Sequence, residues 1–462
     1  MALFFETVQT PGIAQVSYVI GDTAPGVCAV IDPRTDVDIY MDIARRANLQ
    51  ITHIFETHIH ADFVSGSRSL AALVPTADIY VGEENAAYGF PHRAVHDRDR
   101  FTFGGVILEA RHTPGHTPEH MSYVLFSKSD PDSPWGVLTG DSLFVQSAGR
   151  PDLMGSAQTP RLVEQLYDTI HGFYATLPDH VIIYPGHAKG SPCGADIGDR
   201  LTSTIGYERT TNVFLKIKDR AAFKEYALSS APPVPHYYPR MKKLNAAGPE
   251  AMTQLPTVAP LALEKFKQAL NNTDNVLVDT RHMLAFGGGH IAGAVNLGHQ
   301  PEMSIWAGWM LDPQRPILLV VDRPQDIDSV VRLLVRSGYA KFAGYLAGGM
   351  TAWANGGEPL QKLGETPVHE LNNKDRAGRI IDVRTPDEWK GGHIPGAQHM
   401  FLPQLMSSIH QLNRSTAIFT YCATGYRGSI AASVLQQQGF TAVHNVPGSW
   451  QAWRAAGLPV EK

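Results

Sequence analysis

Hydrophobic and polar positions in the amino-terminal part of the chain alternate as expected for strands and helices in succession. Residues 16–22 and 26–33 are short apolar runs bounded by turn-forming residues, and each predicts a β-strand. Residues 36–47 place apolar side chains at helical spacing. Residues 51–58 and 181–187 are further strand-like runs, and each ends in a histidine. Chemically active residues therefore follow strand ends, where loops on a rigid sheet commonly carry function.

A proline-rich stretch interrupts this pattern in the middle of the chain. Residues 229–245 contain too many prolines to predict regular structure, and residues 246–260 add further breakers. We interpret residues 236–262 as a linker. Its Tyr237 and Tyr238 indicate that the linker packs against a domain rather than moving freely.

After the linker, one pattern of strands and helices occurs twice. Residues 276–297 match residues 379–400, and residues 348–353 match residues 448–453. Several anchor residues stay in register across a unit of about 100 residues, which indicates a true repeat. The alternation of strands and helices within each copy predicts an α/β domain with a parallel sheet.

The length of the chain, 462 residues, is too great for one hydrophobic core and predicts about three domains. We place them at residues 1–235, 263–362 and 363–462, with the linker between the first and the second. A hydrophobic content of 43%, a charged content of 18% and a net charge of -5 are typical of a globular protein. This mild acidity argues against nucleic acid or an anionic membrane as a partner.

The amino terminus and the cysteines indicate where the protein works. The first residues have neither the basic start nor the continuous apolar core of a signal peptide. No apolar run approaches the ~18 residues that a membrane span requires. Cys28, Cys193 and Cys422 are too few and too scattered for a disulfide framework, which fits a reducing compartment. We expect a cytoplasmic protein that forms a homo-oligomer, with Cys28 in a strand of the core.

A cysteine in the second copy of the repeat has the surroundings of a reactive group. Cys422 falls opposite Asp322 of the first copy. An apolar strand runs into residues 422–427, and the helix that follows presents backbone N–H groups and a dipole that favour an anionic sulfur. Gly425 lets the loop curl, and Arg427 adds positive charge near the sulfur. The alternative is a buried structural cysteine.

These motifs resemble the rhodanese family of sulfurtransferases, whose active loop reads Cys-x-x-Gly-x-Arg. The likeness covers both copies and includes Asp382, Arg384 and residues 392–397 in the second copy. By this resemblance Cys422 is the catalytic sulfur carrier, and Arg427 binds the anionic sulfur donor.

The first copy resembles a rhodanese domain that has lost its catalytic residue. Asp322 cannot carry a sulfane sulfur, and the loop 322–327 also lacks the glycine and the arginine of the active form. We expect this domain to be catalytically silent and to serve packing or docking.

Candidate metal ligands recur at strand ends in the amino-terminal part of the chain. They are His58, His60, Asp62, His116, Asp141 and His187. Their order and spacing resemble the metallo-β-lactamase fold over nearly all of residues 1–215. In the glyoxalase II-like hydrolases of that fold, the string His-x-His-x-Asp-His and three later ligands hold two metals and a bridging hydroxide.

Phe63 stands where those hydrolases have a histidine, and phenylalanine cannot bind a metal. The change removes one ligand of the second metal, so we expect a centre with a single metal. His58, His116 and Asp141 offer two imidazoles and one carboxylate, which is the ligand set of many non-heme Fe(II) centres. Tetrahedral zinc with a bound hydroxide is the hydrolytic alternative.

The complete layout resembles that of the persulfide dioxygenases, also called sulfur dioxygenases, some of which are fused to two rhodanese domains. The expected fold is an α/β chain in which a metallo-β-lactamase αββα sandwich precedes two rhodanese-like α/β domains with parallel central sheets. The resemblance implies one Fe(II) per chain, held by His58, His116 and Asp141.

The same resemblance assigns roles to residues around the metal. His60, Asp62 and His187 become hydrogen-bond partners of the ligands rather than ligands themselves. Arg150 matches a position near the thiol portion of the substrate, and its alternative role is a salt-bridged loop arginine.

The loop after His187 departs from the pattern of glutathione-using members. These carry a tyrosine where this chain has Lys189. The sequence therefore does not decide whether the thiol that carries the persulfide is glutathione, coenzyme A or another low-molecular-weight thiol. Cys193 lies in the same loop and is either a possible sulfur relay or a small packed residue.

The resemblance implies a function in sulfide detoxification. The amino-terminal domain would oxidise a low-molecular-weight persulfide with O2 to sulfite and thiol, and Cys422 would transfer sulfane sulfur, giving thiosulfate. One alternative is a mononuclear zinc thioester hydrolase of the glyoxalase II type with sulfurtransferase domains. Another is a sulfur-sensing or scaffolding protein whose rhodanese domains only bind partners.

Overall fold

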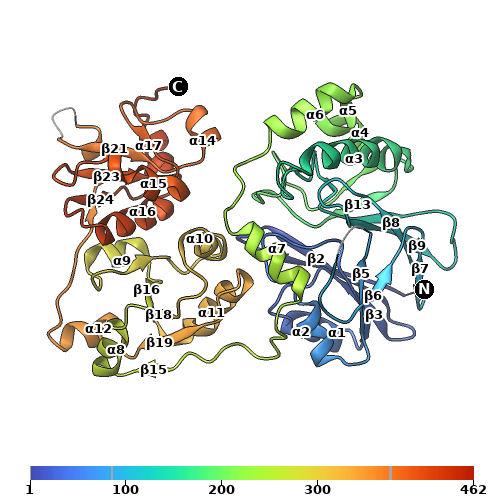
Figure 1. The fold of residues 1–462 in the computed structure, drawn as a ribbon, viewed down its shortest axis with the longest axis horizontal. Coiled ribbons are helices and arrows are strands. Elements are labelled where there is room, and N and C mark those ends of the chain that lie inside the picture. The colour runs from blue at the N-terminus through green and yellow to red at the C-terminus, as the bar shows by residue number, and fades with distance from the viewer. Residues whose placement is uncertain (1, 85–86, 374–376) are drawn as a thin grey trace. The chain divides into compact units, whose positions relative to one another are not determined.

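The computed structural model describes residues 2–84, 87–373 and 377–462, which form two compact units (Figure 1). We call them the amino-terminal unit and the carboxy-terminal unit. The amino-terminal unit comprises Met1–Leu255 and Val335–Gly338. The carboxy-terminal unit comprises Pro256–Leu334 and Tyr339–Lys462.

Two six-stranded sheets form the centre of the amino-terminal unit (Figure 1). The first has the strand order β1-β2-β3-β4-β5-β6 and the second the order β14-β13-β10-β9-β8-β7. The strands of the first sheet are β1 (Leu3–Thr10), β2 (Gln15–Asp22), β3 (Val27–Ile31), β4 (Gln50–Phe55), β5 (Asp78–Gly82) and β6 (Arg93–Val95). Those of the second are β7 (Arg100–Phe103), β8 (Val106–His112), β9 (Met121–Ser127), β10 (Gly136–Gly140), β13 (Ile182–Pro185) and β14 (Ser203–Thr204). A short hairpin adds β11 (Leu143–Phe144) and β12 (Ser147–Ala148).

The two sheets pack face to face, and helices cover their outer faces. Side chains such as Tyr18, Phe55 and Leu138 fill the space between the sheets, and every residue of β2 is buried. Helices α1 (Asp38–Arg46) and α2 (Ser67–Leu73) pack on the first sheet, and α3 (Thr159–Gly172) packs on the second. The remaining helices of this unit are η1 (Tyr174–Thr176), α4 (Ile205–Thr211), α5 (Val213–Lys216), α6 (Arg220–Ser229) and α7 (Tyr238–Ala247). This arrangement confirms the expected αββα sandwich.

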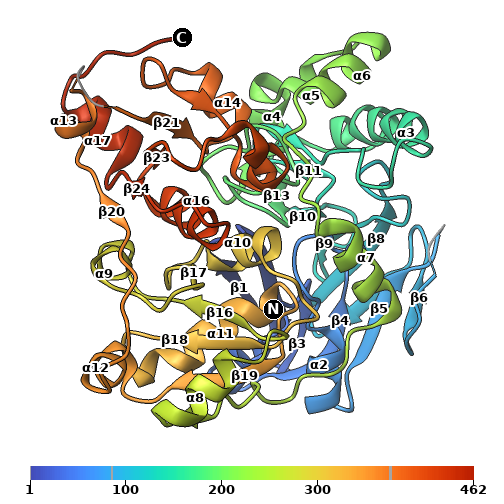
Figure 2. The same ribbon diagram turned by 60° about the vertical axis from the view of Figure 1, so that its left-hand side comes forward.

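The carboxy-terminal unit contains two five-stranded sheets in which all paired strands are parallel (Figure 2). The first sheet, in the order β15-β19-β18-β16-β17, consists of β15 (Pro260–Leu261), β16 (Val276–Asp279), β17 (Val295–Asn296), β18 (Ile317–Val320) and β19 (Phe342–Leu346). The second, in the order β20-β24-β23-β21-β22, consists of β20 (Gly364–Glu365), β21 (Arg379–Asp382), β22 (Gln398–His399), β23 (Ile418–Tyr421) and β24 (Val443–Asn445). The identical strand order confirms that one α/β domain occurs twice.

Short helices connect the strands of both repeats. Those of the first repeat are α8 (Leu263–Leu270), α9 (Met283–Gly288), α10 (Met303–Met310), η2 (Pro324–Asp326), α11 (Ile327–Arg336) and α12 (Gly349–Asn355). Those of the second are α13 (Val368–Leu371), α14 (Pro386–Lys390), η3 (Leu402–Gln404), α15 (Leu405–Ser408), η4 (Ile409–Gln411), α16 (Tyr426–Gln437) and α17 (Ser449–Ala455). Among the described residues, no helix combines the length and the apolar character that a membrane crossing requires.

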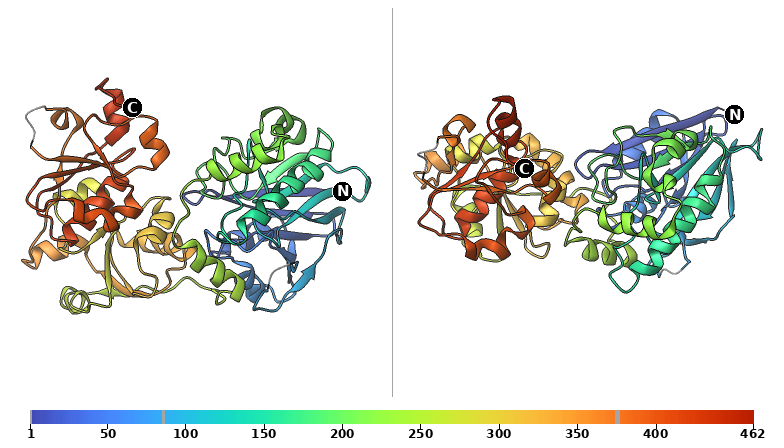
Figure 3. Two further views of the ribbon diagram at one scale, coloured as in Figure 1. Left: turned by 45° about the horizontal axis from the view of Figure 1, so that its top comes forward. Right: turned by 90° about the horizontal axis from the view of Figure 1, so that it is seen from above.

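Helix α7 corrects one expectation from the sequence. Residues 236–262 were expected to lack regular structure because of their prolines, but α7 occupies Tyr238–Ala247 within them (Figure 3). Pro239 lies in its first turn, where a helix tolerates proline because the missing N–H would have no partner there. Tyr238, Met241 and Asn245 are buried, and the helix belongs to the amino-terminal unit.

Candidate metal centre and sulfur-transfer loop

Two imidazoles and one carboxylate converge inside the amino-terminal unit. His58, His116 and Asp141 are all buried, and one ligand atom from each lies within 4.8 Å of the others. The Nε2 atoms of His58 and His116 lie 3.9 and 3.6 Å from Oδ2 of Asp141. They come from the loops after β4, β8 and β10, so strand ends of both sheets supply the site.

Hydrogen bonds fix the orientation of both imidazoles. Nδ1 of His58 lies 2.9 Å from the Thr57 hydroxyl oxygen, and Nδ1 of His116 lies 2.9 Å from the Arg150 carbonyl oxygen. In each ring Nδ1 is engaged and Nε2 faces the shared space, as in many metal sites where a neighbour holds the ligand in place.

Asp141 leaves one oxygen of its carboxylate unsatisfied. Oδ1 accepts a hydrogen bond of 2.7 Å from His187 Nδ1, whereas the buried Oδ2 has no hydrogen-bond partner among the described residues. A buried carboxylate oxygen without a partner is costly unless a cation neutralises it. The donor set therefore fits a metal ion bound by both Nε2 atoms and Asp141 Oδ2.

The protonation states of the three side chains suit metal binding. Burial lowers the pKa of His116 to about 4, against an opposing effect of Asp141. Burial and the neighbouring imidazoles also lower the pKa of His58. Burial would raise the pKa of Asp141, but His187 overcomes this effect and lowers it. Two neutral imidazoles and one carboxylate therefore present their lone pairs.

Two glycines allow the surrounding loops to approach the ligands closely. A Cβ atom at Gly149 would lie 1.8 Å from the carbonyl oxygen of Asp141 and 3.0 Å from Nδ1 of His116. A Cβ atom at Gly186 would lie 2.7 Å from Oδ1 of Asp141. The close packing requires glycine at both positions.

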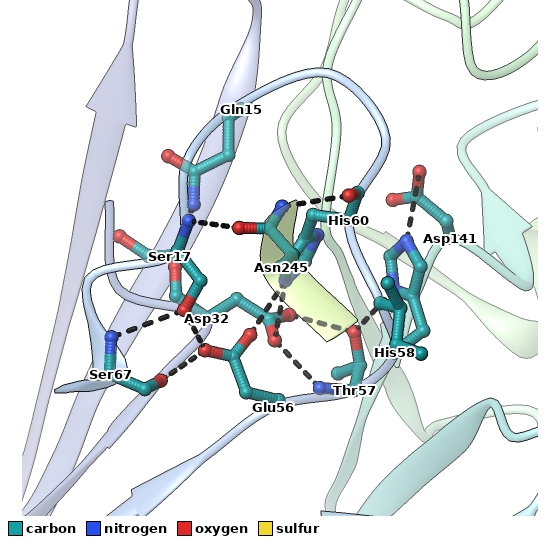
Figure 4. Close-up of polar contacts among 12 residues, drawn as sticks. Gln15, Ser17, Asp32, Glu56, Thr57, His58, His60, Ser67, Asp141 and Asn245 are labelled. Carbon is teal, nitrogen blue, oxygen red and sulfur yellow. Dashed lines mark hydrogen bonds and ion pairs between the residues drawn. The ribbon is translucent and has the colours of Figure 1, made fainter. Parts of the chain in front are cut away.

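His60 lies beside the cluster, but its Nε2 atom is used elsewhere. This atom lies 2.9 Å from Oε2 of Glu56 and 3.2 Å from Oδ1 of Asp32 (Figure 4). The Phe63 ring is fully buried and lies 4.4 Å from the His60 ring, so it occupies space beside that imidazole.

His187 and Asp62 form a chain of hydrogen bonds behind the cluster. Besides Asp141, His187 contacts Asp62 through Nε2, which lies 2.8 Å from the Oδ2 atom. Burial alone would lower the pKa of His187, but the two carboxylates raise it to about 10. A cationic imidazole thus holds Asp141 in position.

Helix α7 supplies contacts that our sequence analysis missed. Nδ2 of Asn245 donates hydrogen bonds of 2.8 Å to the carbonyl oxygens of both His60 and Phe63. Its Oδ1 accepts a bond of 3.0 Å from the Ser65 amide. The helical spacing of Tyr238 and Asn245 was present in the sequence, but the proline content concealed it.

Arg150 and Cys193 both lie close to the cluster. The Arg150 guanidinium forms bonds of 2.6 and 2.8 Å with Asp152, and the side chain is only 2% exposed. Cys193 is buried, its Sγ lies 3.8 Å from the Tyr238 hydroxyl, and it groups with Asp62 and His187 within 4.8 Å. Burial and nearby carboxylates raise the pKa of the Cys193 thiol.

The loop after Cys422 encloses its sulfur atom. The Gly425 amide donates a hydrogen bond of 3.1 Å to Sγ, and Gly425 adopts a φ of 113°, which favours glycine. The Cys422 amide donates to the Ser449 hydroxyl at 3.1 Å. The Arg427 guanidinium makes two bonds of 2.7 Å with the carboxylate of Glu388. Arg427 also interacts with the Cys422 side chain, which confirms that it places positive charge near the sulfur. Its role in donor binding stays a prediction.

The corresponding loop of the first repeat has a different composition and follows β18. Asp322 is exposed at the position that aligns with Cys422. The next residue, Arg323, pairs with Asp326 at 2.8 Å.

Family comparisons agree with this division of the chain. The metallo-beta-lactamase superfamily matches residues 10–187, and the rhodanese-like domain family matches residues 262–356 and 367–456. A solved structure of a metallo-beta-lactamase from Staphylococcus aureus is 34% identical, with a TM-score of 0.68. The likeness covers 75% of this chain and 99% of that one.

Two curated relatives of the amino-terminal unit have different activities in their names. The mitochondrial persulfide dioxygenase ETHE1 of Bos taurus is 30% identical over 46% of this chain and 78% of the relative. The probable polyketide biosynthesis zinc-dependent hydrolase BaeB of Bacillus velezensis is 30% identical over 41% of this chain and 80% of the relative. Sequence similarity therefore does not distinguish an oxidation from a hydrolysis, and the distinction depends on the chemistry of the site.

Proposed function

Because the chain belongs to the metallo-β-lactamase superfamily and carries two rhodanese-like domains, we propose that it is a persulfide dioxygenase that also transfers sulfur. The amino-terminal unit converts a persulfide, O2 and water into a thiol, sulfite and two protons. Cys422 then carries a sulfane sulfur to sulfite, which gives thiosulfate and regenerates the thiol. Both reactions serve sulfide detoxification.

The ligand set of the buried cluster is the observation that supports this proposal. His58, His116 and Asp141 form a set of two imidazoles and one carboxylate, which suits Fe(II). His60 lies outside this group of three, and its Nε2 is engaged by Glu56 and Asp32, whereas its buried Nδ1 has no hydrogen-bond partner among the described residues. When bound in this cluster, one Fe(II) per chain would supply redox chemistry with O2 that no side chain provides.

The residues around the cluster position the ligands. Thr57 and the Arg150 carbonyl orient the two imidazoles, and His187 holds the carboxylate of Asp141. We assign the Arg150 side chain to the thiol substrate and Cys193 to a possible sulfur relay. The carrier is glutathione, coenzyme A or another low-molecular-weight thiol, and the setting is a cytoplasmic homo-oligomer.

Metal analysis after anaerobic purification, combined with an oxygen electrode, tests this function. We expect about one iron per chain and O2 uptake that depends on an added persulfide. His116→Ala should lose both the iron and the O2 uptake, because one of the three ligands is gone. His180→Ala, at an exposed position outside the cluster, is the matched control and should retain both.

A zinc-dependent thioester hydrolase is the second candidate function. The similarity to a hydrolase named as zinc-dependent favours it, since a single zinc with a bound hydroxide can hydrolyse an ester. Zinc in the purified protein, with thioester cleavage and no O2 uptake, would support this candidate against the dioxygenase.

A further inference from the structure

A cavity of about 490 Å³ lies within the carboxy-terminal unit, beside the silent loop of the first repeat. Its volume falls in the range of small-molecule sites, roughly 300–1,000 Å³. Its lining includes Arg281, Met283, Asp322, Arg323, Thr424 and Tyr426.

The cavity has the position in which α/β domains usually bind ligands. Its walls are the segments that follow β16, β17 and β18, at the carboxyl ends of these parallel strands. In the strand order β18-β16-β17, the strand that follows β16 in the chain, β17, lies on one side of it, and the next strand, β18, lies on the other. Such a reversal creates a crevice outside the carboxyl ends of the strands. The first repeat has therefore kept its binding crevice although it lost its cysteine.

The catalytic loop of the second repeat completes the wall of this cavity. Thr424 and Tyr426 line it, and the Tyr426 hydroxyl donates a hydrogen bond of 3.1 Å to the Gly298 carbonyl. A Cβ atom at Gly425 would lie 2.8 Å from Sδ of Met283, another lining residue. Gly425 is also the residue whose amide contacts Cys422 Sγ. A ligand in the cavity would thus lie against the loop that holds the reactive sulfur.

The charged groups of the cavity are paired, with one exception. Arg281 is bound to Asp279 at 2.6 Å, and Arg323 is bound to Asp326. Asp322 is exposed and forms no close ion pair among the described residues, although the neighbouring Arg323 interacts with it electrostatically. The cavity therefore offers one carboxylate that is not held in a close ion pair, together with imidazole, amide and hydroxyl groups, whereas both of its arginines are bound to aspartates.

We propose that this cavity binds the organic part of a persulfide carrier that has an ammonium group, and that Asp322 pairs with this ammonium. The inference rests on the proposed sulfur transfer and narrows its substrate class. The Cys422 thiolate attacks the outer sulfur of the carrier persulfide, the sulfur–sulfur bond breaks, and the carrier leaves as a thiolate. His282, His299 and Gln300 can hydrogen-bond the peptide or carboxylate groups of a peptide-like carrier.

The charge of the cavity disfavours a phosphorylated carrier such as coenzyme A. Its phosphates would face the carboxylates of Asp322 and Asp326, and both arginines of the lining are already bound to aspartates. The residue that replaced the catalytic cysteine would therefore act in carrier selection.

The test compares two persulfides that differ only in the ammonium group, glutathione persulfide and its N-acetylated form. In full-length protein, we expect the KM for sulfur transfer to sulfite to be about fivefold higher for the acetylated form, as for one exposed charge pair. Asp322→Asn should abolish this ratio by raising the KM for glutathione persulfide to that for the acetylated form. Asp328→Asn, at an exposed carboxylate of α11 that does not line the cavity, should preserve the ratio.

Binding of S-methylglutathione, which cannot transfer sulfur, gives a readout that is independent of catalysis. Calorimetry should show about fivefold weaker binding to the full-length Asp322→Asn protein than to the wild type. An unchanged affinity together with an unchanged KM ratio would overturn the proposal. Binding that depends on Asp322 in a protein without sulfurtransferase activity would support the cavity assignment and refute the proposed function instead.

Discussion

The carboxylate of Asp141 decides what the amino-terminal site can bind. One oxygen is held by His187 and the other has no partner among the described residues. A side chain in this state needs both its cationic neighbour and a metal, because a buried carboxylate alone is strongly disfavoured. His187 therefore positions a ligand without being one of the three residues in the cluster.

We predict that His187→Ala weakens metal binding by about 10–100-fold without preventing folding, since a partner of a ligand is lost rather than a ligand. Competition with a chelator, followed by metal analysis, measures this effect. His180→Ala is the control. Metal retention equal to that of the wild type would show that Asp141 holds its position without His187.

Among the secondary-structure elements, helix α7 contacts the loop of the candidate metal site directly through hydrogen bonds. One side chain of this helix, Asn245, bonds the backbone at His60, Phe63 and Ser65. Because the loop that contains these residues also carries His58, the helix stabilises the local geometry of the centre. A proline-rich segment thus has a structural role in the site.

We predict that Asn245→Ala destabilises the amino-terminal unit by about 2 kcal/mol, because two carbonyl oxygens and one amide lose their buried partner. Urea unfolding measures the loss, and metal analysis should show a parallel decrease in affinity. Lys243→Ala, on the exposed face of the same helix, should change neither quantity. Equal stability of the two variants would contradict a role of Asn245 in holding the loop.

Helix α14 holds the catalytic loop of the second repeat through an ion pair. Burial would raise the pKa of Glu388, but its bonds with Arg427 lower it to about 2, below the ordinary value of 4.5. A carboxyl group with a lowered pKa stabilises the fold fully above its ordinary value. The stabilisation is lost as the pH falls from about 4.5 towards 2.

We predict that the loop 422–427 becomes more accessible to hydrogen exchange below about pH 4.5, as Glu388 is protonated and its bonds with Arg427 weaken. Glu388→Gln should expose the loop already at neutral pH and show a smaller pH dependence. Asp387→Asn, which changes an exposed neighbour on α14, is the control. Identical exchange profiles for wild type and Glu388→Gln would exclude the ion pair as the stabilising contact.

At the scale of the whole molecule, the two units are proposed to carry two consecutive reactions. The product of the first, sulfite, is the acceptor of the second, so one chain can convert persulfide sulfur to thiosulfate. The two proposed reactions would use different residues, because the proposed metal ligands and Cys422 lie in different units.

We predict that Cys422→Ser changes the product of the full-length protein from thiosulfate to sulfite, while O2 uptake with a persulfide continues at the wild-type rate. The reason is that serine cannot carry a sulfane sulfur, whereas the metal cluster is untouched. Ion chromatography of the products and an oxygen electrode measure the two effects. Cys28→Ser, at a buried strand position away from both sites, is the control and should preserve the product distribution. Loss of both thiosulfate formation and O2 uptake in Cys422→Ser would contradict the assignment of the two activities to separate sites.

The sequence by itself determined the fold class and the repeat, and it singled out three side chains that the structure brings together, His58, His116 and Asp141. Apolar periodicity is a local property, so it located strands such as β2 and β4 and the helix α1 correctly. Motif spacing within one loop was sufficient to single out His58 as a ligand candidate, and the repeat aligned Cys422 with Asp322.

Only the tertiary structure decided how the side chains around these residues are paired. Asn245 and His60 are 185 residues apart, and Arg427 and Glu388 are 39 apart, so no local pattern could connect them. The direction of the His60 ring depends on acidic partners from two different loops. A side chain adopts the state that its three-dimensional neighbours stabilise, and those neighbours meet only when the chain has folded.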